Sequence, residues 1–443
     1  MAERTRTLEV RRDGYAFRRF RLRVIEGPDR GLEAASSGEE ATAGTAPGND
    51  LLLRDPTVSR HHLAIRATAG GLELRDLGST NGTILGGYRV KLAVLEPGAL
   101  LRAGEDVIRV ELLDEEVLEP VSARAQFGAL IGDSPAMRRL FAVLERFAAG
   151  QGTVLLEGET GTGKELVAEA IHREGPRRGG PFVVVDCGAV PPTLLESELF
   201  GHARGAFTGA ERDRRGAVAA ARGGTLFLDE IGELSLEVQP VLLRLLESGT
   251  FARVGEQRRQ AADIRVIAAT NRDLREEVNR GRFRADLFYR LAVLRVRVPP
   301  LRERLQDVPL LVRHFCRQLT GEEGDEGRLP DDLVTALSRQ RWPGNVRELR
   351  AAVQRALIFG DATRWREGQV GPDAPTLVDV GMTYGEAKER AIGAWEADYV
   401  RRLLEQYGGN QSRAARAVGM SRAHLRALMG RYGLLGAEGG PSF

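Results

Sequence analysis

The sequence predicts a multidomain protein with an N-terminal all-β sandwich, a central α/β domain with a helical lid, and an all-α C-terminal segment. In residues 1–113, short apolar runs alternate with Gly, Asp and Asn turns, which is typical of antiparallel strands. In the centre, apolar runs alternate with helix-length segments, which indicates parallel strands joined by helices. Beyond residue 384 the apolar residues recur at helical spacing instead.

The composition is that of a globular protein rather than a disordered or membrane-spanning one. Of the 443 residues, 42% are hydrophobic and 28% are charged. The formal net charge is only +2, so any nucleic-acid surface must be local. No secretory leader or long apolar span is visible, and we expect a cytoplasmic protein. Cys187 and Cys316 form no metal-ligand or disulfide pattern and are expected to be buried thiols.

The expected β sandwich covers residues 1–113, and its clearest strands are at residues 51–53, 72–74 and 107–110. An acidic stretch that ends in Pro120 follows, and residues 114–127 are expected to be a linker.

The expected α/β core covers residues 128–305, and its lid covers residues 306–360. Four short apolar runs have the composition of buried parallel strands. They lie at residues 154–156, 182–185, 226–228 and 264–267. A Gly-, Pro- and Asp-rich second linker is expected at residues 361–383, before a helical domain at residues 384–443.

A glycine-rich loop follows the first of these strands and opens a helix, which is the context of a Walker A phosphate-binding loop. The loop consists of Gly158, Glu159, Thr160, Gly161, Thr162, Gly163 and Lys164. Its backbone amides and the helix N-terminus would face the phosphates of ATP, and Lys164 would reach the β and γ phosphates. The next residue is Glu165, so the hydroxyl that often binds Mg²⁺ there is absent, and Thr160 and Thr162 are the nearby hydroxyls.

An acidic pair ends the strand at residues 226–228, as in a Walker B motif. We expect Asp229 to hold Mg²⁺ and Glu230 to polarise the attacking water. Asn271 ends the following strand, where it would either sense the γ phosphate or cap the strand.

Three arginines complete the predicted nucleotide site. Arg284 and Arg290 would either enter the site of a neighbouring subunit and offset phosphoryl charge, or remain solvated. Arg347 lies where a lid helix is expected to begin and fits a sensor II position.

At this point the central block resembles the AAA+ domain of the sigma-54-dependent activators, or bacterial enhancer-binding proteins. The resemblance rests on residues 196–202 (ESELFGH) and on the family's contact loop at residues 205–210. That loop consists of Gly205, Ala206, Phe207, Thr208, Gly209 and Ala210. The resemblance implies that the loop projects from an ATPase ring, with a hexamer as its expected form, and contacts sigma-54 through Phe207 and Thr208. From residue type alone, Phe207 could equally lie in the core.

The same resemblance makes Glu165 an expected residue. It also shows Asp186 where many members have an asparagine that restrains the catalytic glutamate. An aspartate can accept and orient hydrogen bonds too, so we expect the control of Glu230 to survive.

The C-terminal segment has the spacing of a helix-turn-helix. Asn410 can start one helix, Gly419 and Met420 can form the turn, and Ser421 can cap a second helix that runs to about Arg431. Five arginines and no acidic residue lie between Asn410 and Tyr432. The residues expected to contact DNA are Ser421, Arg422, Ala423, His424 and Arg426. The segment resembles the Fis-like helix-turn-helix of many such activators, with helical pairing for oligomerisation as the alternative.

Two N-terminal motifs, residues 58–62 (VSRHH) and 77–83 (LGSTNGT), resemble the forkhead-associated (FHA) domain, a β sandwich that binds phosphothreonine. The resemblance implies a phosphate site formed by Ser59, Arg60, Thr80 and Asn81. His62 is expected to brace the loop. Thr45 stands where the family has an arginine, which removes one charge-assisted contact. A domain retained for intramolecular or protein contacts is the alternative.

These features predict an ATPase that activates transcription by sigma-54 RNA polymerase, bound to double-stranded DNA upstream of the promoter. ATP and Mg²⁺ are the expected cofactors, and a phosphothreonine protein is a further expected partner. The alternatives are a DNA-binding regulator that keeps the AAA+ fold for assembly alone, and a phosphothreonine adaptor. The complete hydrolysis motifs and the loop at residues 205–210 argue against both.

Overall fold

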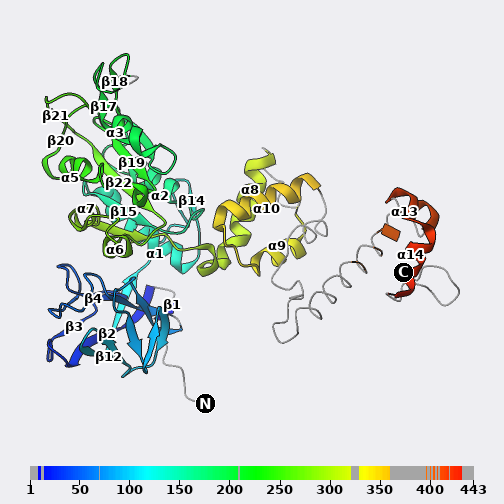
Figure 1. Cartoon of the computed structure of the whole chain (residues 1–443), viewed down its shortest axis with the longest axis horizontal. Helices are drawn as coiled ribbons and strands as arrows, with labels where there is room; N and C mark the ends of the chain where they lie inside the picture. The colour runs from blue at the N-terminus through cyan, green and yellow to red at the C-terminus, as the bar shows by residue number, and fades with distance from the viewer. Residues whose placement is uncertain are drawn as a thin grey trace. The chain divides into compact units, whose positions relative to one another are not determined.

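The computed structural model describes residues 8–10, 14–68, 70–207, 210–320, 329–359, 396, 400, 403–404, 407, 410–418 and 420–431. Contacts between residues divide the chain into two compact units, Met1–Gly360 and Asp361–Phe443. The first unit holds a β sandwich, a parallel α/β domain and a helical lid, as predicted (Figure 1). In the described ranges, no helix is long and apolar enough to cross a membrane.

The N-terminal domain consists of two sheets packed face to face. Their strands are β1 (Leu8–Val10), β2 (Gly14–Glu26), β3 (Glu33–Ala35), β4 (Glu40–Gly44), β5 (Leu51–Leu52), β6 (Leu63–Thr68), β7 (Gly71–Asp76), β8 (Thr83–Leu85), β9 (Tyr88–Val90), β10 (Leu92–Leu95), β11 (Leu100–Ala103) and β12 (Asp106–Pro120). One sheet has the order β1-β2-β12-β11-β8-β9, with β3 also paired to β2, and the other has the order β10-β7-β6-β4-β5. Inward-facing side chains of both sheets, such as Phe20, Ile65 and Ile108, share one buried core.

The acidic segment after residue 113 differs from the expected linker. Residues 114–120 continue β12, which pairs with β2 across a register shift between Leu112 and Glu116. Arg18 lies 2.8 Å from Asp114, and Arg19 lies 2.9 Å from Glu115. Basic side chains on β2 thus face the acidic run, and such cross-strand pairs support a strand that charge and proline alone would argue against.

The α/β domain has a five-stranded parallel sheet in the order β16-β19-β22-β15-β23. These strands are β15 (Val154–Glu157), β16 (Phe182–Asp186), β19 (Thr225–Asp229), β22 (Arg265–Thr270) and β23 (Leu294–Arg297). Successive residues belong to cores on opposite faces: Leu155 lies in one, and Val154 and Leu156 lie in the other. The sheet therefore needs helices on both faces, which explains its nearly continuous apolar strands.

Helices cover this sheet and form the lid. They are α1 (Pro135–Ala149), α2 (Lys164–Arg173), α3 (Pro192–Phe200), α4 (Ala217–Ala220), α5 (Gln239–Ser248), α6 (Leu274–Asn279), α7 (Ala285–Leu291), and in the lid α8 (Val308–Thr320), α9 (Asp331–Ser338) and α10 (Asn345–Phe359). The short 3-10 helices are η1 (Ile231–Glu233), η2 (Leu301–Glu303) and η3 (Leu305–Asp307). Short two-stranded pairs join β13 (Gln126–Phe127) to β14 (Leu130–Ile131), β17 (Gly201–His202) to β18 (Arg214–Arg215), and β20 (Thr250–Phe251) to β21 (Gln260–Ala261).

The second unit contains α13 (Gln411–Ala417) and α14 (Arg422–Arg431). Asn410 caps α13, because its side chain accepts the amide of Arg413 at 3.1 Å. Ser421 caps α14 by accepting the amide of His424 at 3.1 Å. Ala414, Ala415, Leu425 and Met429 are buried between the helices. The apolar residues that recur at helical spacing before them, Ile392, Trp395 and Tyr399, lie outside the described residues, as does Gly419 of the turn.

Candidate nucleotide, contact-loop and DNA sites

The Walker A loop wraps around the ammonium group of Lys164. Gly161 and Gly163 have φ values of 80° and 102°, which glycine adopts without strain. Lys164 starts α2, is only 7% exposed, and donates from Nζ to the carbonyl of Gly158 at 3.0 Å. The loop thus curls back on its own lysine at a helix N-terminus, a geometry suited to a polyphosphate.

The Walker B and sensor residues lie at the same edge of the sheet. The carboxyl ends of β15, β19 and β22 meet there because these strands are parallel neighbours. Lys164 Nζ lies 3.7 Å from Glu230 Oε1, and the amide of Asn271 donates to Glu230 Oε2 at 3.3 Å. The Asn271 side chain donates to Thr160 Oγ1 at 3.0 Å. The structure therefore brings the predicted lysine, glutamate and asparagine into one cluster.

The two hydroxyls near Lys164 differ in their surroundings. Thr162 is buried, and its hydroxyl donates to the carbonyl of Glu159 at 2.8 Å. Thr160 is exposed and faces Asn271. Only Thr160 therefore keeps its hydroxyl on the open side of the loop. Glu165 lies exposed in the first turn of α2.

The lid grips the Walker loop through Asn345, a residue to which the sequence assigned no role. Asn345 is fully buried and donates to Glu159 Oε2 at 3.2 Å and to the carbonyl of Thr160 at 3.1 Å. It also accepts the amide of Leu301 at 2.8 Å. The amide of Arg347 donates to the carbonyl of Gly161 at 3.3 Å, so the predicted sensor II arginine lies at the loop.

This contact is close enough to exclude a side chain at position 161. A Cβ on Gly161 would lie 2.4 Å from the carbonyl oxygen of Gly344. Asn345 itself has a φ of 54°, a left-handed conformation that asparagine tolerates better than most residues.

Two further arginines support the loop, and sequence reasoning missed both. Arg302 makes a bidentate pair with Glu159 at 2.6 and 2.7 Å, and this pair lowers the pKa of Glu159. Arg304 is 3% exposed and donates to the carbonyl of Thr162 at 3.0 Å, while burial lowers its pKa to about 10. More than 140 residues separate each pair in the sequence, so no local pattern indicates it.

Asp186 bonds to the turn that follows it rather than to Glu230, the predicted catalytic glutamate. Its Oδ1 accepts the amides of Gly188 and Ala189 at 2.9 and 3.1 Å. Among the hydrogen bonds of the described residues, none joins Asp186 to Glu230. Control of Glu230 by Asp186 stays a prediction.

The two arginines predicted to act on a neighbouring subunit lie at the surface around α7. Arg284 pairs with Asp286 at 2.7 Å, and Arg290 donates twice to the carbonyl of Leu246, at 3.0 and 3.1 Å. Within the described residues, neither hydrogen-bonds to a Walker residue of its own chain. Their action on a neighbouring subunit stays a prediction.

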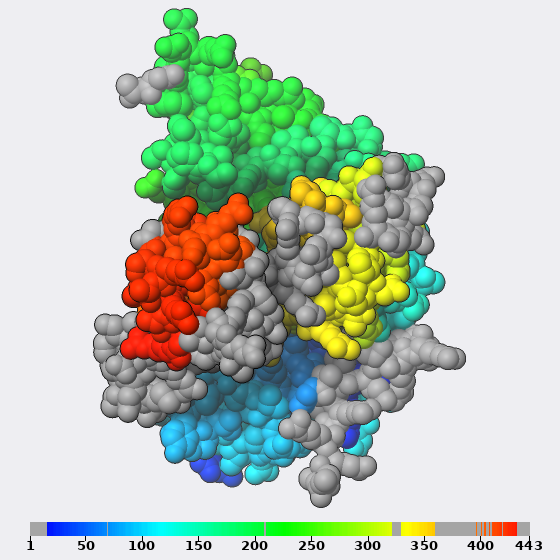
Figure 2. Space-filling view, turned by 90° about the vertical axis from the view of Figure 1, so that its right-hand side faces the viewer, coloured from blue at the N-terminus to red at the C-terminus, as the bar shows by residue number. Residues whose placement is uncertain are grey.

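The predicted contact loop forms the tip of the β17–β18 hairpin. Figures 1 and 2 show this hairpin at one end of the α/β domain, where it stands out from the surface. The amide of Gly205 donates to the carbonyl of Ala210 at 2.8 Å and closes the loop. Phe207 is 38% exposed, with its ring 4.9 Å from that of His202, so it is not a core residue. Thr208 and Gly209 lie outside the described residues.

The predicted phosphate-binding loops of the sandwich lie side by side. Ser59 Oγ accepts the amide of Thr80 at 2.9 Å, and the side chain of Asn81 donates to the carbonyl of Thr57 at 2.7 Å, so both bonds join the two loops. His62 accepts the amide of Ser59 at 3.2 Å through Nδ1, and its Nε2 lies 3.3 Å from the carbonyl of Gly82, as expected for a bracing residue.

Position 45 carries a threonine, where the FHA resemblance leads one to expect an arginine. The amide of Thr45 donates to the carbonyl of Ser59 at 3.1 Å. Arg89 of β9 donates to the carbonyl of Ser79 at 3.3 Å and supplies a cation beside the loop that the sequence motifs did not reveal. Arg60 points toward the α/β domain instead, with its guanidinium 3.1 Å from the carbonyl of Val278.

The helix-turn-helix presents its basic residues to solvent. Arg422, Ala423, His424 and Arg426 are all exposed on α14, while Leu425 between them is buried. The helix therefore has an apolar face toward α13 and a basic face available to a phosphate backbone.

Comparison with known families matches each part of the chain. A family model described as "Sigma-54 interaction domain" matches residues 130–297, and one described as "AAA+ ATPase lid domain" matches residues 302–372. Residues 392–432 match "Bacterial regulatory protein, Fis family". Residues 23–112 match a model described as "Inner membrane component of T3SS, cytoplasmic domain".

Related proteins cover most of the chain. It is 45% identical over 303 residues to the Nif-specific regulatory protein of Azotobacter vinelandii, which covers 66% of this chain and 56% of that protein. It is 43% identical over 360 residues to the anaerobic nitric oxide reductase transcription regulator NorR of Citrobacter koseri, with 77% and 70% covered. The solved structure of NtrX from Brucella abortus in complex with ATP is also similar, at 36% identity and a TM-score of 0.50, with 70% of each chain covered. From this coverage and the assembled nucleotide site, we conclude that the chain belongs to the sigma-54-dependent transcriptional activators and that its central domain is an AAA+ ATPase.

Proposed function

We propose that a ring of these subunits, with a hexamer as the expected form, hydrolyses ATP to remodel the closed complex of sigma-54 RNA polymerase and open promoter DNA. The observation that carries this proposal is the cluster of Lys164, Glu230 and Asn271 beneath the lid. NtrX, whose structure resembles this chain, was solved with ATP bound. In the ring, Arg284 and Arg290 would complete the site of the adjacent subunit.

The residues at this site fit ATP with Mg²⁺. Lys164 lies at the start of α2, 3.7 Å from the carboxylate of Glu230, and Asp229 accepts the amide of Glu230 at 3.0 Å. No group of three His, Cys, Asp or Glu side chains that could hold a metal occurs in the ranges that the structure covers. Asp229 would therefore share the ion with phosphate oxygens and water, as Mg²⁺ prefers, and the ion would neutralise charge that develops on the phosphates.

Hydrolysis at this site would be coupled to the hairpin through the sheet and its helices. Glu230 would orient the attacking water, while Asn271 would report the γ phosphate by its bond to Glu230. The hairpin tip, with the half-exposed Phe207 in a glycine-framed loop, is suited to contact sigma-54. DNA binding through α14 would hold the ring near the promoter.

The test is in vitro transcription from a sigma-54 promoter with purified polymerase, ATP and the full chain. We expect ATP-dependent open complexes with the native chain and none with Lys164→Ala. If the native chain hydrolysed ATP and bound DNA but opened no promoter, the alternative would stand, namely a DNA-binding regulator that uses the AAA+ fold for assembly.

The sandwich would regulate the ring by recognising phosphothreonine through Ser59, Thr80 and Arg60. The adjacency of Ser59 and Thr80 supports this function, and Arg89 offsets the arginine missing at position 45. Calorimetry of the full chain with a degenerate phosphothreonine peptide pool, against the same pool with threonine, tests it. Equal affinities would exclude phosphate recognition.

A further inference from the structure

The loop face of the sandwich, which we define as residues 59–62 and 77–80, lies against α6 of the α/β domain. Asn279, the last residue of α6, donates to the carbonyls of His61 and Leu77, the latter at 2.9 Å. It also accepts the amide of His61 at 3.3 Å. The side-chain amide of Asn279 thus makes three hydrogen bonds with the loop face, two through its nitrogen and one through its oxygen.

Aromatic rings from the two domains also pack against each other at this contact. His61 is 3% exposed, and its ring lies 5.6 Å from Phe288, nearly perpendicular to it, and 6.0 Å from Tyr289. Tyr289 also lies against the sandwich, because a Cβ on Gly48 would be 2.8 Å from its ring. These rings belong to α7, the helix that carries Arg290 and follows Arg284.

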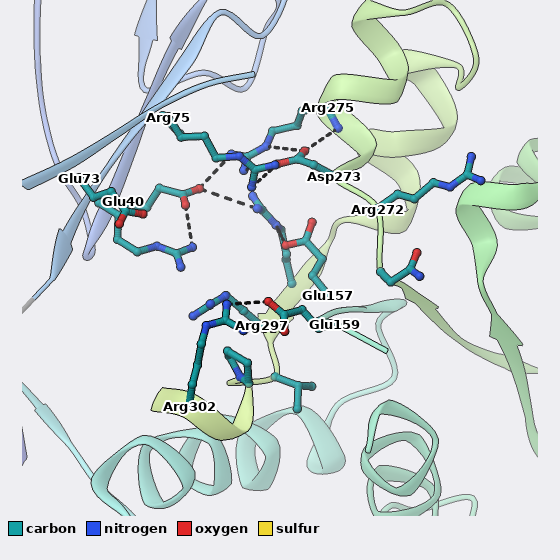
Figure 3. A pocket seen from close by; sticks show the side chains of 17 residues that line it. Glu40, Glu73, Arg75, Glu157, Glu159, Arg272, Asp273, Arg275, Arg297 and Arg302 are labelled. Carbon is teal, nitrogen blue, oxygen red and sulfur yellow. Dashed lines mark hydrogen bonds and ion pairs between the residues drawn. The ribbon is translucent and has the colours of Figure 1, made fainter. Parts of the chain in front are cut away.

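A buried ion network flanks the contact, as Figure 3 shows. Glu40 of β4 lies 2.9 Å from Arg275, which also contacts Asp273 at 3.2 Å. Burial alone would raise the pKa of Glu40, but neighbouring arginines, with Arg275 the strongest, lower it to about 2. At the rim, Arg75 lies 2.7 Å from Glu276. Removal of one partner would leave a charge buried and unpaired in the closed contact, so the network favours docking only while it is complete.

The network also reaches the nucleotide site. Arg295 of β23 lies 3.8 Å from Glu40 and 2.7 Å from Glu157, the residue before Gly158 of the Walker loop. Asp273 follows Asn271 by two residues. The contact between the domains is therefore continuous with the segments that bind and sense ATP.

The same surface would serve a phosphothreonine peptide. Arg60 donates to a neutral carbonyl on α6 at 3.1 Å, whereas a phosphate would accept a stronger, charge-assisted bond from it. Thr80 stays exposed beside Ser59. A peptide that drew Arg60 toward Ser59 and Thr80 would have to break the contact with Val278 and displace α6 from the loop face.

We propose that this contact is an internal lock, in which the loop face holds α6 and α7 in a resting position and a phosphothreonine peptide releases them. The lock keeps the segment that carries Arg284 and Arg290 from entering a neighbouring site. Release rests on the phosphothreonine recognition proposed above, whereas the lock itself does not.

Charge reversal at the rim of the contact tests the lock in the full chain. Arg75→Glu would face Glu276 and Asp273 with a like charge, whereas Arg75→Glu with Glu276→Arg restores an opposite pair. Arg102→Glu makes the same charge change at an exposed position of β11 and is the control. The readouts are hydrogen exchange at residues 59–62 and 274–279 and the ATPase rate at low protein concentration.

We expect Arg75→Glu to speed exchange in both segments and to raise the ATPase rate severalfold. The double variant should reverse both effects, and Arg102→Glu should change neither. Unchanged exchange in Arg75→Glu would overturn the docking, and faster exchange with an unchanged ATPase rate would overturn the lock.

Peptide binding tests the release. A degenerate phosphothreonine peptide pool should bind Asn279→Ala about tenfold more tightly than the native chain, because the loop face is no longer covered. In the native chain the pool should speed exchange at residues 274–279. Equal affinity and unchanged exchange would overturn the release but leave phosphothreonine recognition standing. If the pool bound neither protein, both recognition and release would fail, and the charge-reversal series would still decide the lock.

Discussion

Two non-glycine residues with positive φ, Glu230 at 48° and Asn345 at 54°, flank the nucleotide site from opposite domains. They are the only such residues in the described part of the chain. Sparsely populated backbone conformations persist where surrounding contacts over-determine them, often at functional sites. Here the contacts are the bonds from Asn345 to the Walker loop and from Asn271 to Glu230.

Glu230→Gln should retain ATP binding while the rate of hydrolysis falls by about 10²- to 10⁴-fold, the usual contribution of a general base. The amide keeps the size of the side chain but cannot take up a proton. Calorimetry with ATP and a steady-state phosphate-release assay measure the two effects. Glu237→Gln, an exposed acid beyond η1, is the matched control and should behave as the native chain. Normal turnover in Glu230→Gln would remove this residue from the mechanism.

The thiol of Cys187 should be inert in the folded protein. Burial, and then the carboxylates of Asp186, Asp229 and Glu230, raise its pKa to about 12. Its thiolate fraction at pH 8 is therefore on the order of 10⁻⁴. Cys316 is also buried. A colorimetric thiol reagent should detect almost no rapid reaction in the native chain and two thiols after denaturation. Rapid labelling of native Cys187 would show that the site is more open than the structure indicates.

Among the elements, α14 presents a basic face because its apolar residues are used against α13. Leu425 and Met429 are buried, whereas the residues expected to contact DNA are exposed. The unit also contains two capped helix starts, at Asn410 and Ser421. Orientation of the arginines thus follows from packing of the helix pair.

Arg422→Ala and Arg426→Ala should each weaken DNA binding by about 1–3 kcal/mol if the arginine contacts a base. If it contacts a phosphate instead, the dependence of log affinity on log salt should become shallower by about one. Fluorescence anisotropy over a salt series distinguishes the two contacts. Arg258→Ala, an exposed arginine of the α/β domain, is the control. No change in either variant would favour helical pairing for oligomerisation.

The β17–β18 hairpin carries the proposed contact with sigma-54, apart from the residues proposed for ATP hydrolysis. Thr208→Ala should leave the ATPase rate within about twofold of the native value, because β17 and β18 form a separate sheet from the parallel strands that carry the Walker residues. It should nevertheless abolish open-complex formation. A permanganate footprint of the promoter measures opening. Full opening by Thr208→Ala would remove the loop's proposed role.

The three parts of the first unit share contacts that join the sandwich, the Walker loop and the lid. Glu40 bonds to Arg275, Arg295 links Glu40 to Glu157, and Arg302 holds Glu159. The sandwich, the Walker loop and the segment that leads into the lid are therefore linked by direct side-chain contacts. The proposed lock uses this adjacency and needs no long-range signal.

Docking of the sandwich should weaken as the pH falls below 6.5. Burial first, and then Arg275, Arg60 and Arg295 against an opposing effect of Asp273, lower the pKa of His61 to about 4. Once undocked, the ring would regain a pKa near 6.5, so the undocked state binds the proton more readily between these values. At pH 5.5 the docking equilibrium should shift by about tenfold relative to pH 7.5. Hydrogen exchange at residues 274–279 over this range measures it.

His61→Phe keeps an aromatic ring in the contact but removes the titrating group. Its docking should not respond to pH between 7.5 and 5.5. An equal pH response in this variant would assign the effect to another group.

Features carried by short stretches of chain could be predicted from the sequence. The Walker loop, the acidic pair at residues 229–230, the caps Asn410 and Ser421, and the strands of the parallel sheet each depend on neighbouring residues and their periodicity. Their physics is local, because turns, caps and apolar faces are set within a few residues.

The folded structure alone decided the contacts between distant segments. Asn345 and Arg302 meet the Walker loop across more than 140 residues, and Asn279 meets the loop face across 202 and 218 residues. The acidic residues 114–120 became a strand for the same reason, since their arginine partners lie on β2. Burial and charge pairing depend on which surfaces meet in space, and that is settled only when domains pack.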